Sequence, residues 1–261
     1  MTPSFLVFFT SYLGELFRSS REDKVFQRRD VRMVILRQLK FTGAQSFRLV
    51  GIAALFVGIM TVAQSTAQLQ RFGGGNALGP LLVAAIIREL GPLLTTLIVV
   101  SRSVSAVASE LSSMKANGEI ELLQSVGVSP LSYLVLPRVL GGAFSVFLLC
   151  IHFVAVALVS GFIFGQLFVS MPLSKFVLDI LHTLSPIDVV IFTLKSLGAG
   201  FGIFLLATFV GLRTSGRSYE VPQATTQAVV YSFLVTFAFQ AFTSLFYYFV
   251  ILDFSFGGIG L

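Results

Sequence analysis

Charged residues are scarce in this sequence. They make up 11% of its 261 residues, whereas hydrophobic residues make up 55%. Soluble domains carry about 25% charged residues, so this shortage excludes an ordinary soluble domain. Long apolar runs are typical of chains that cross a bilayer as helices. We therefore predict an all-α integral membrane protein, whose net charge of +6 reflects its orientation in the membrane and not a nucleic-acid partner.

Residues for common catalytic and metal chemistry are absent or isolated. Neither a G-x-x-x-x-G-K-[ST] phosphate loop nor an H-E-x-x-H motif occurs, and no cysteine–histidine cluster has zinc spacing. His152 and His182 have no partners that suggest a catalytic triad. The single cysteine, Cys150, lies in an apolar run and is expected to be a packing residue. We expect no enzyme activity, cofactor or metal on this chain, so another chain would hydrolyse any nucleotide.

Five apolar runs are long enough to cross a bilayer, which takes about 20 helical residues. We predict spans at residues 47–64, 78–100, 139–165, 187–212 and 224–252. The third lies in a longer run, 131–171, for which a tight double crossing is the alternative, although no turn signal interrupts residues 144–160. The amphipathic stretch 171–186 predicts a small surface helix between the third and fourth spans.

The first 46 residues form a separate segment ahead of the spans. Apolar residues recur at helical spacing around Phe5 and Phe9, and again around Val31 and Val34, with arginines nearby. This pattern predicts amphipathic helices in the membrane interface; a basic cytoplasmic tail is the alternative.

Lysine and arginine counts predict the orientation. Fourteen lie in residues 1–48 and in the connections after the second and fourth spans, against two in the other connections. Because positive residues accumulate on the cytoplasmic side, we expect a cytoplasmic N-terminus and a periplasmic C-terminus.

A few polar residues lie inside the predicted spans. Arg88 and Glu89 are in the middle of the second, and Lys195 and Gln240 are in the fourth and fifth. Charges at that depth are costly and are expected to face the protein interior or a wet cavity. Adjacent helical residues diverge by about 100°, so we expect Arg88 and Glu89 to reach different helices. Two roles stay open for these residues: they make polar contacts between helices, or they line a cavity. For His152 the contact between helices is favoured.

Several segments in order resemble a known family. They are IIRELGP at 86–92, the polar helix-prone run from SRSVSAVASEL to YLVLPR at 101–138, and QATTQAVV at 223–230. Together, over about residues 45–250, they resemble the MlaE/YrbE family of ABC-transporter permeases. The resemblance implies an interfacial N-terminal helix followed by a permease domain at residues 47–261. It also implies phospholipid transport between the inner and outer membranes, from a multi-pass position in the inner membrane.

The resemblance also implies partners. They are a second permease copy, two ABC ATPase subunits that bind ATP and magnesium, a periplasmic hexamer of MCE-domain proteins and a small STAS-domain protein. Other hydrophobic cargo, such as a sterol, stays open, as does a scaffold that transports nothing. An ion-coupled transporter that uses Glu89 is a further alternative, but no internal repeat supports it.

Two sets of site residues follow from the resemblance. The implied lipid cavity is lined by Thr61, Gln64, Gln68, Phe72, Arg88, Glu89, Lys195 and Gln240. The implied ATPase-coupling region, residues 106–130, presents Glu110, Met114, Lys115, Glu119, Glu121, Leu122 and Val126. We expect Glu110 to brace the coupling helix. Relatives can carry an acid where this chain has Gln240, which favours Glu89 as the partner of Lys195.

Overall fold

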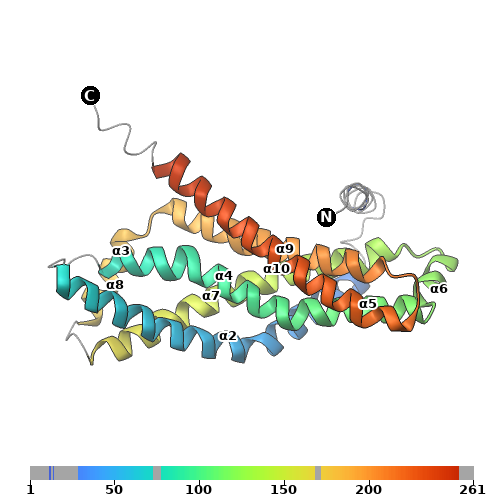
Figure 1. Cartoon of the computed structure of the whole chain (residues 1–261), viewed down its shortest axis with the longest axis horizontal. Coiled ribbons are helices and arrows are strands. Elements are labelled where there is room, and N and C mark those ends of the chain that lie inside the picture. Colours follow the sequence, from blue (N-terminus) through green and yellow to red (C-terminus); the bar gives the residue numbers. More distant parts are fainter. Residues whose placement is uncertain (1–11, 13, 15–28, 73–77, 168–171, 253–261) are drawn as a thin grey trace. The chain divides into compact units, whose positions relative to one another are not determined.

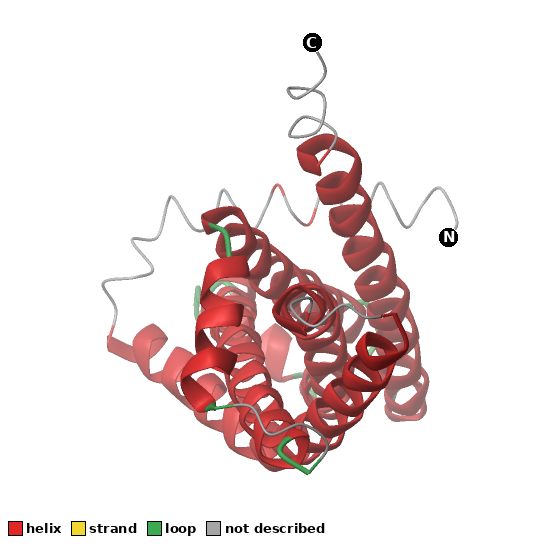
Figure 2. Ribbon diagram, turned by 90° about the vertical axis from the view of Figure 1, so that its left-hand side faces the viewer, coloured by secondary structure: helices red, strands yellow, loops and turns green. Residues whose placement is uncertain are grey.

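The fold is helical throughout its described part. The structure is a computed structural model that describes residues 12, 14, 29–72, 78–167 and 172–252, and every regular element in these ranges is a helix (Figures 1 and 2). Five helices are long and apolar enough to cross a bilayer, at residues 42–68, 79–116, 131–165, 186–212 and 218–249. This confirms the predicted all-α membrane fold with five spans. The expected amphipathic stretch around Phe5 and Phe9 lies outside the described residues.

The helices follow one another with short connections. The described chain opens with α2 (Arg29–Phe72) and continues as one helical run made of α3 (Leu78–Leu82), the π-helical η2 (Val83–Leu90), α4 (Gly91–Val99), the π-helical η3 (Val100–Val104) and α5 (Ser105–Ala116). The short α6 (Glu119–Ser125) precedes the π-helical η4 (Leu131–Val135) and α7 (Leu136–Gly165). The rest comprises α8 (Leu173–Thr183), α9 (Pro186–Leu212), the 3-10 turn η5 (Ser218–Glu220), α10 (Val221–Phe246) and the π-helical η6 (Tyr247–Leu252).

The first two membrane helices extend further than the apolar runs. Residues 31–40 belong to α2, in one helix with the first span, because no proline interrupts residues 29–72. The second helical run continues past residue 100 through serine- and alanine-rich sequence to Ala116. It ends only at Asn117 and Gly118, where Gly118 adopts φ +76°, a conformation that favours glycine. The first half of the polar insert is therefore an extension of the membrane helix.

The third apolar run crosses once. Residues 131–165 form η4 and α7 without a break, so the alternative of a tight double crossing is wrong. The sequence lacks a turn signal there because it encodes a single long helix. The predicted small surface helix is confirmed as α8.

The chain divides into two compact units. The first contains residues 1–45, 99–145 and 200–235, and the second contains residues 46–98, 146–199 and 236–261. In the second unit α2 packs closely on α7, since a Cβ atom at Gly58 would collide with the backbone carbonyl of Ala157. In the first unit α5 packs on α9, where Gly211 contacts Leu111 and Ala108. Each unit therefore has its own tightly packed helix contacts.

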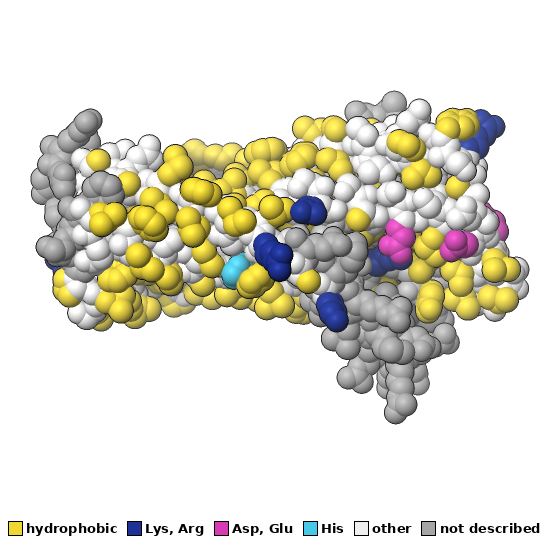
Figure 3. All heavy atoms as spheres, turned by 90° about the horizontal axis from the view of Figure 1, so that it is seen from below, with side chains coloured by type: hydrophobic (Ala, Val, Ile, Leu, Met, Phe, Trp, Pro, Cys, Tyr) yellow, Lys and Arg dark blue, Asp and Glu magenta, His cyan; other side chains and the backbone are white. Residues whose placement is uncertain are grey.

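Large apolar side chains are exposed along the membrane helices. They include Ile52, Phe56 and Met60 on α2 and Leu148 and Ile163 on α7. Figure 3 shows one face of the molecule on which hydrophobic side chains cover much of the described surface and charged ones are few. Soluble monomers rarely expose such continuous apolar surface, whereas lipid chains are a suitable neighbour for it.

Candidate functional site

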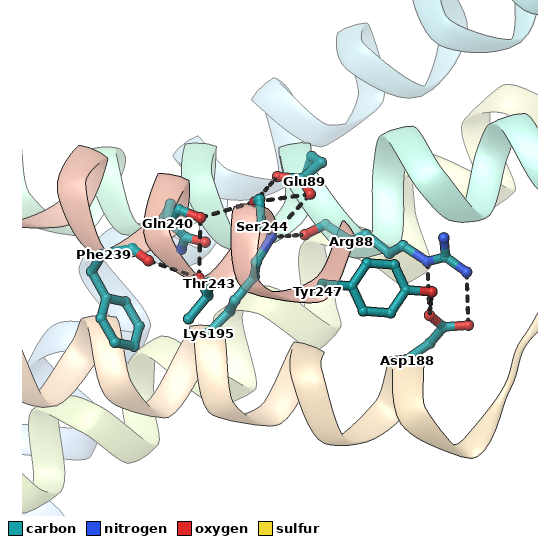
Figure 4. Close-up of polar contacts among 9 residues, drawn as sticks. All are labelled: Arg88, Glu89, Asp188, Lys195, Phe239, Gln240, Thr243, Ser244 and Tyr247. Atoms are coloured by element: carbon teal, nitrogen blue, oxygen red, sulfur yellow. Dashed lines mark hydrogen bonds and ion pairs between the residues drawn. The ribbon is translucent and has the colours of Figure 1, made fainter. Parts of the chain in front are cut away.

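A buried ammonium group is the centre of the site. Lys195 of α9 points toward Glu89 of η2 and Ser244 of α10, all within the second unit (Figure 4). Its Nζ donates to the Glu89 Oε1 at 3.0 Å, to the Arg88 carbonyl oxygen at 2.8 Å and to the Ser244 Oγ at 2.7 Å. We call Arg88, Glu89, Lys195 and Ser244 the Lys195 cluster. An ammonium has three N–H groups, so all of them are bonded.

The cluster is asymmetric in its exposure. Lys195 is 1% exposed, whereas the side chain of Glu89 is 36% exposed. The Ser244 hydroxyl also lies 2.8 Å from the Glu89 Oε2, to which it can donate while accepting from Lys195. A charge removed from water is tolerated only when it is paired and hydrogen-bonded. The cation is thus held inside, and its counterion reaches the surface.

Local sequence explains why a backbone carbonyl takes part. Pro92 lies four residues after Arg88 and has no N–H. It therefore removes the donor that an α-helix would supply to the Arg88 carbonyl. That carbonyl accepts a hydrogen bond from the Lys195 ammonium. The R-E-L-G-P motif thus provides a carboxylate and an available main-chain oxygen at one place.

The side chain of Arg88 makes a second ion pair. Its Nε lies 2.7 Å from the Asp188 Oδ1, and a terminal guanidinium nitrogen donates to the Asp188 Oδ2 at 3.1 Å. The Tyr247 ring lies 4.8 Å from the guanidinium carbon, in cation–π geometry. The Tyr247 hydroxyl donates to the same carboxylate at 3.4 Å. Arg88 is thereby fixed between α9 and η6.

Asp188 also lies in the first turn of helix α9 and caps its start. The Ser185 backbone N–H donates to the Asp188 Oδ2 at 2.9 Å, and the Asp188 N–H donates to the Ser185 Oγ at 3.3 Å. These reciprocal bonds form a capping box, with Pro186 at the first helical position. Sequence reasoning missed Asp188, although S-P-I-D at the start of an apolar run is the pattern that reveals it. One buried carboxylate therefore both caps α9 and neutralises Arg88.

The expectation that Arg88 and Glu89 reach different helices is wrong for α9. Both contact it, through Asp188 and Lys195, and Glu89 additionally contacts Ser244 of α10. The two α9 residues are seven positions apart, or about 10.5 Å at 1.5 Å per residue. The long arginine side chain spans this offset along the helix axis. The expected pairing of Glu89 with Lys195 is confirmed at 3.0 Å.

The side chains of the other residues predicted to line the cavity make no hydrogen bond to the Lys195 cluster where the structure describes them. Gln240 is 4% exposed, and its side-chain amide has no hydrogen-bond partner among the described residues. Thr61 is half-buried on α2, whereas Gln64 and Gln68 are exposed. No hydrogen bond within the described part of the chain joins these three to the Lys195 cluster. The side chain of Phe72 lies outside the described set.

His152 contacts a neighbouring helix by stacking. Its ring lies on that of Phe47 with centroids 3.8 Å apart and an interplanar angle of 19°. The imidazole also lies against Gly51. These contacts join α7 to α2 and confirm the prediction that His152 makes a contact between helices.

The predicted coupling region forms a helix–turn–helix within the first unit. Arg138 of α7 donates to Glu110 of α5 at 2.9 Å, which is the kind of contact a brace requires. The Lys115 Nζ donates to the Leu212 carbonyl at 2.6 Å and so caps the end of α9. Met114 is half-buried nearby.

The short helix α6 presents an exposed mixed surface. Leu122 of α6 and Val126, directly after its last residue, are 65% and 67% exposed. The side chains of Glu119 and Glu121 are exposed in its first turn. Acids favour that position because the helix dipole is positive there. Ile120 is buried and attaches the helix to its unit. Exposed apolar residues beside acids are suited to docking a protein partner.

Comparison with known proteins settles the family. The family model described as "Permease MlaE" matches residues 35–246. The chain belongs to the MlaE permease family.

Named relatives agree with this assignment. The chain is 28% identical over 203 residues to the intermembrane phospholipid transport system permease protein MlaE of Haemophilus influenzae, covering 77% of this chain and 78% of that one. It is 29% identical over 215 residues to a probable ABC transporter permease of Rickettsia prowazekii, covering 82% and 83%. It is also 29% identical over 212 residues to the chloroplastic protein TRIGALACTOSYLDIACYLGLYCEROL 1 of Arabidopsis thaliana, covering 79% of this chain and 60% of that one.

This MlaE-family permease therefore carries two groups of polar contacts. The Lys195 cluster and the Arg88–Asp188 pair lie in the second unit, and the Glu110–Arg138 and Lys115–Leu212 contacts lie in the first. Sequence reasoning located one residue or more of each contact. It missed Asp188, Ser244 and Tyr247.

Proposed function

We propose that this chain is the transmembrane permease subunit of an ABC transporter that moves phospholipids between the inner and outer membranes. Its family and the intermembrane phospholipid transport permease among its relatives support this function. Five apolar helices support a multi-pass position in the membrane, which we assign to the inner membrane. The N-terminus is cytoplasmic and the C-terminus periplasmic.

The observation that carries the proposal is the buried ammonium of Lys195 with a partly exposed counterion. A phospholipid phosphate has the same charge as Glu89 and the same preference for N–H donors. It competes with Glu89 for Lys195 when a lipid enters, and Glu89 recaptures the ammonium when the lipid leaves. The neutral Glu89–Lys195 pair keeps the empty site closed without leaving a buried charge unpaired.

Energy enters through a partner. ATP and magnesium bind to separate ATPase subunits, and the exposed surface of α6 is where these dock. The Glu110–Arg138 pair and the Lys115–Leu212 bond pass motion of α5 and α6 to α7 and α9 of the same unit. The assembly contains two permease copies, two ATPases, a periplasmic MCE-domain hexamer and a small STAS-domain protein.

Lipid retention and lipid transfer test the role of the cluster. The complex is purified, its bound lipids are identified by mass spectrometry, and transfer of labelled phospholipid between vesicles is measured. We expect Lys195→Met to lose both bound phospholipid and transfer. Glu89→Gln removes the competing charge, so bound phospholipid rises while transfer falls.

A matched lysine provides the control. Lys175→Met changes an exposed lysine on α8 and should leave retention and transfer unchanged. If Lys195→Met retains and transfers phospholipid normally, Lys195 is only a contact between helices. Recovery of a sterol in place of phospholipid contradicts the proposed cargo.

A further inference from the structure

A polar cavity lies in the first unit, where α9 ends and α10 begins. Its volume is 520 Å³, within the range of about 300–1,000 Å³ that is typical of small-molecule sites. The walls carry Arg213, Tyr219, Glu220, Gln223, Gln227 and Tyr231, with Val210, Thr214 and Ala224 completing them. None of these residues belongs to the Lys195 cluster, and the proposed function does not use them.

The walls are held in place by the α9–α10 turn itself. The Glu220 Oε2 accepts the Ser215 N–H at 2.7 Å. The Arg217 guanidinium donates to the Tyr219 hydroxyl at 2.7 Å and lies 5.9 Å from the centre of its ring. Gly216 makes the bend with φ +81°. A site that is organised before its ligand arrives loses less entropy on binding.

The charges in the walls are of both signs. Arg213 provides a guanidinium, which suits a phosphate, and Glu220 provides a carboxylate, which suits an ammonium. Gln223 and Gln227 lie one helical turn apart on α10 and add amide donors and acceptors. Tyrosine is common where a protein meets the membrane–water boundary. These groups fit a ligand that carries both a phosphate and an amine.

Other ligand classes fit less well. An anionic headgroup without an amine faces the Glu220 carboxylate with a like charge. A sterol has no charge and so offers no phosphate to the Arg213 guanidinium and no ammonium to the Glu220 carboxylate. The wall also includes the apolar Val210 and Ala224, against which the glycerol and the first chain carbons pack.

We propose that this cavity binds the headgroup of a zwitterionic amino-phospholipid of the phosphatidylethanolamine type. The proposal rests on the proposed function in taking phospholipid as the cargo, and adds a headgroup class and a second lipid site. The Lys115–Leu212 bond ties α5 to the end of α9, whose residues Val210 and Arg213 flank that carbonyl and line the cavity. Lipid occupancy therefore acts on the coupling region.

The absence of tryptophan from the chain allows a direct test. Tyr219→Trp places the single tryptophan of the chain in the cavity wall, at a position that is 62% exposed and beside Arg217. The full-length protein in detergent is titrated with dihexanoyl-phosphatidylethanolamine and with dihexanoyl-phosphatidylglycerol. We expect a saturable emission change with tighter binding of the ethanolamine lipid. Tyr133→Trp, an exposed position outside the cavity, should show no saturable change.

Two substitutions assign the charges. Arg213→Gln in the Tyr219→Trp background should weaken binding of both lipids by about tenfold or more, as loss of a charge-assisted bond does, and Arg213→Lys should restore part of it. Glu220→Gln keeps an acceptor for the Ser215 N–H, so the turn is preserved. It should weaken binding of the ethanolamine lipid, so that this lipid no longer binds more tightly than the glycerol lipid.

The source of the headgroup is distinguished by competition. Glycerophosphoethanolamine, which lacks acyl chains, should displace the lipid, whereas inorganic phosphate at the same concentration should not. Displacement by phosphate alone, equal affinity for both lipids, or a tryptophan signal that responds to the ATPase and not to lipid would each overturn the proposal. Normal phospholipid transfer with no response at Trp-substituted Tyr219 refutes this site alone, and a response without any phospholipid transfer refutes the transport function alone.

Discussion

Removal of Asp188 should destabilise the second unit more than removal of any exposed acid. Asp188 is 1% exposed, accepts one hydrogen bond from the Arg88 guanidinium, lies 2.7 Å from its Nε in an ion pair, and caps α9. Asp188→Ala leaves the guanidinium, whose side chain is 17% exposed, without its counterion. Breaking a buried pair in this way costs about 3–5 kcal/mol, and loss of the helix cap adds about 1 kcal/mol.

The magnitude must be reduced for a membrane protein. Polar contacts inside membrane proteins are worth less than expected because the unfolded chain in lipid or detergent also finds partners. Taking the lower limit of about 3 kcal/mol, and about 2–4 °C for each kcal/mol in a chain of this size, we expect a fall in Tm of about 6–12 °C. Asp188→Asn retains an acceptor for the Ser185 N–H, so it should keep the helix cap. Its fall in Tm should therefore include only the contribution from the lost charge.

The protein provides its own reporter for this assay. Cys150 is the only cysteine and is fully buried in α7 of the same unit, so a thiol-reactive dye becomes fluorescent only when the unit opens. Heating the detergent-purified variants with the dye gives Tm. Glu119→Ala, which removes an exposed acid from α6, is the control and should change Tm little. An unchanged Tm for Asp188→Ala would show that the Arg88 pair is not a stabilising contact.

Two further predictions concern packing and coupling. Gly58→Ala should lower Tm by an amount corresponding to about 1–3 kcal/mol of overpacking, because its Cβ meets the Ala157 carbonyl. In the control Gly43→Ala the added Cβ meets nothing within 4 Å, so this change should raise stability slightly. Equal effects of the two substitutions on Tm would contradict the packing argument. Glu121→Lys should abolish the stimulated ATPase activity of the complex while the permease remains in the membrane, because it reverses an exposed charge on α6. Lys175→Glu on α8 is its control, and full activity of Glu121→Lys removes the coupling assignment.

The sequence predicts the spans because apolar length is a strong signal. It predicts less about where each helix ends. Residues 101–116 contain serines, an arginine, a glutamate and a lysine, and so resemble a loop, yet they contain no glycine or proline to stop a helix that has already begun. The first such signal is Asn117–Gly118, and the helix ends there. Helix-breaking residues, and not polarity, determine this boundary.

The sequence likewise predicts some residues of the site and not others. The cost of charges inside a membrane identified Arg88, Glu89 and Lys195 and the pairing of the last two. Asp188 was missed because it lies at the first turn of a predicted span, where an acid attracts little notice, although S-P-I-D is a recognisable cap. Ser244 is one of many hydroxyls in the chain, and only packing of α10 against η2 and α9 selects it.

The bond from Lys195 to the Arg88 carbonyl has a consequence for how this site tolerates mutation. The acceptor is a main-chain atom, so no substitution at residue 88 can delete it, however much the side chain changes. The residue that controls the acceptor is Pro92, which forms no part of the cluster. A change of Pro92 to any other amino acid returns a backbone N–H to the helix, and this donor can compete with Lys195 for the carbonyl. The geometry of the cluster therefore also depends on a residue that a survey of charged side chains would overlook.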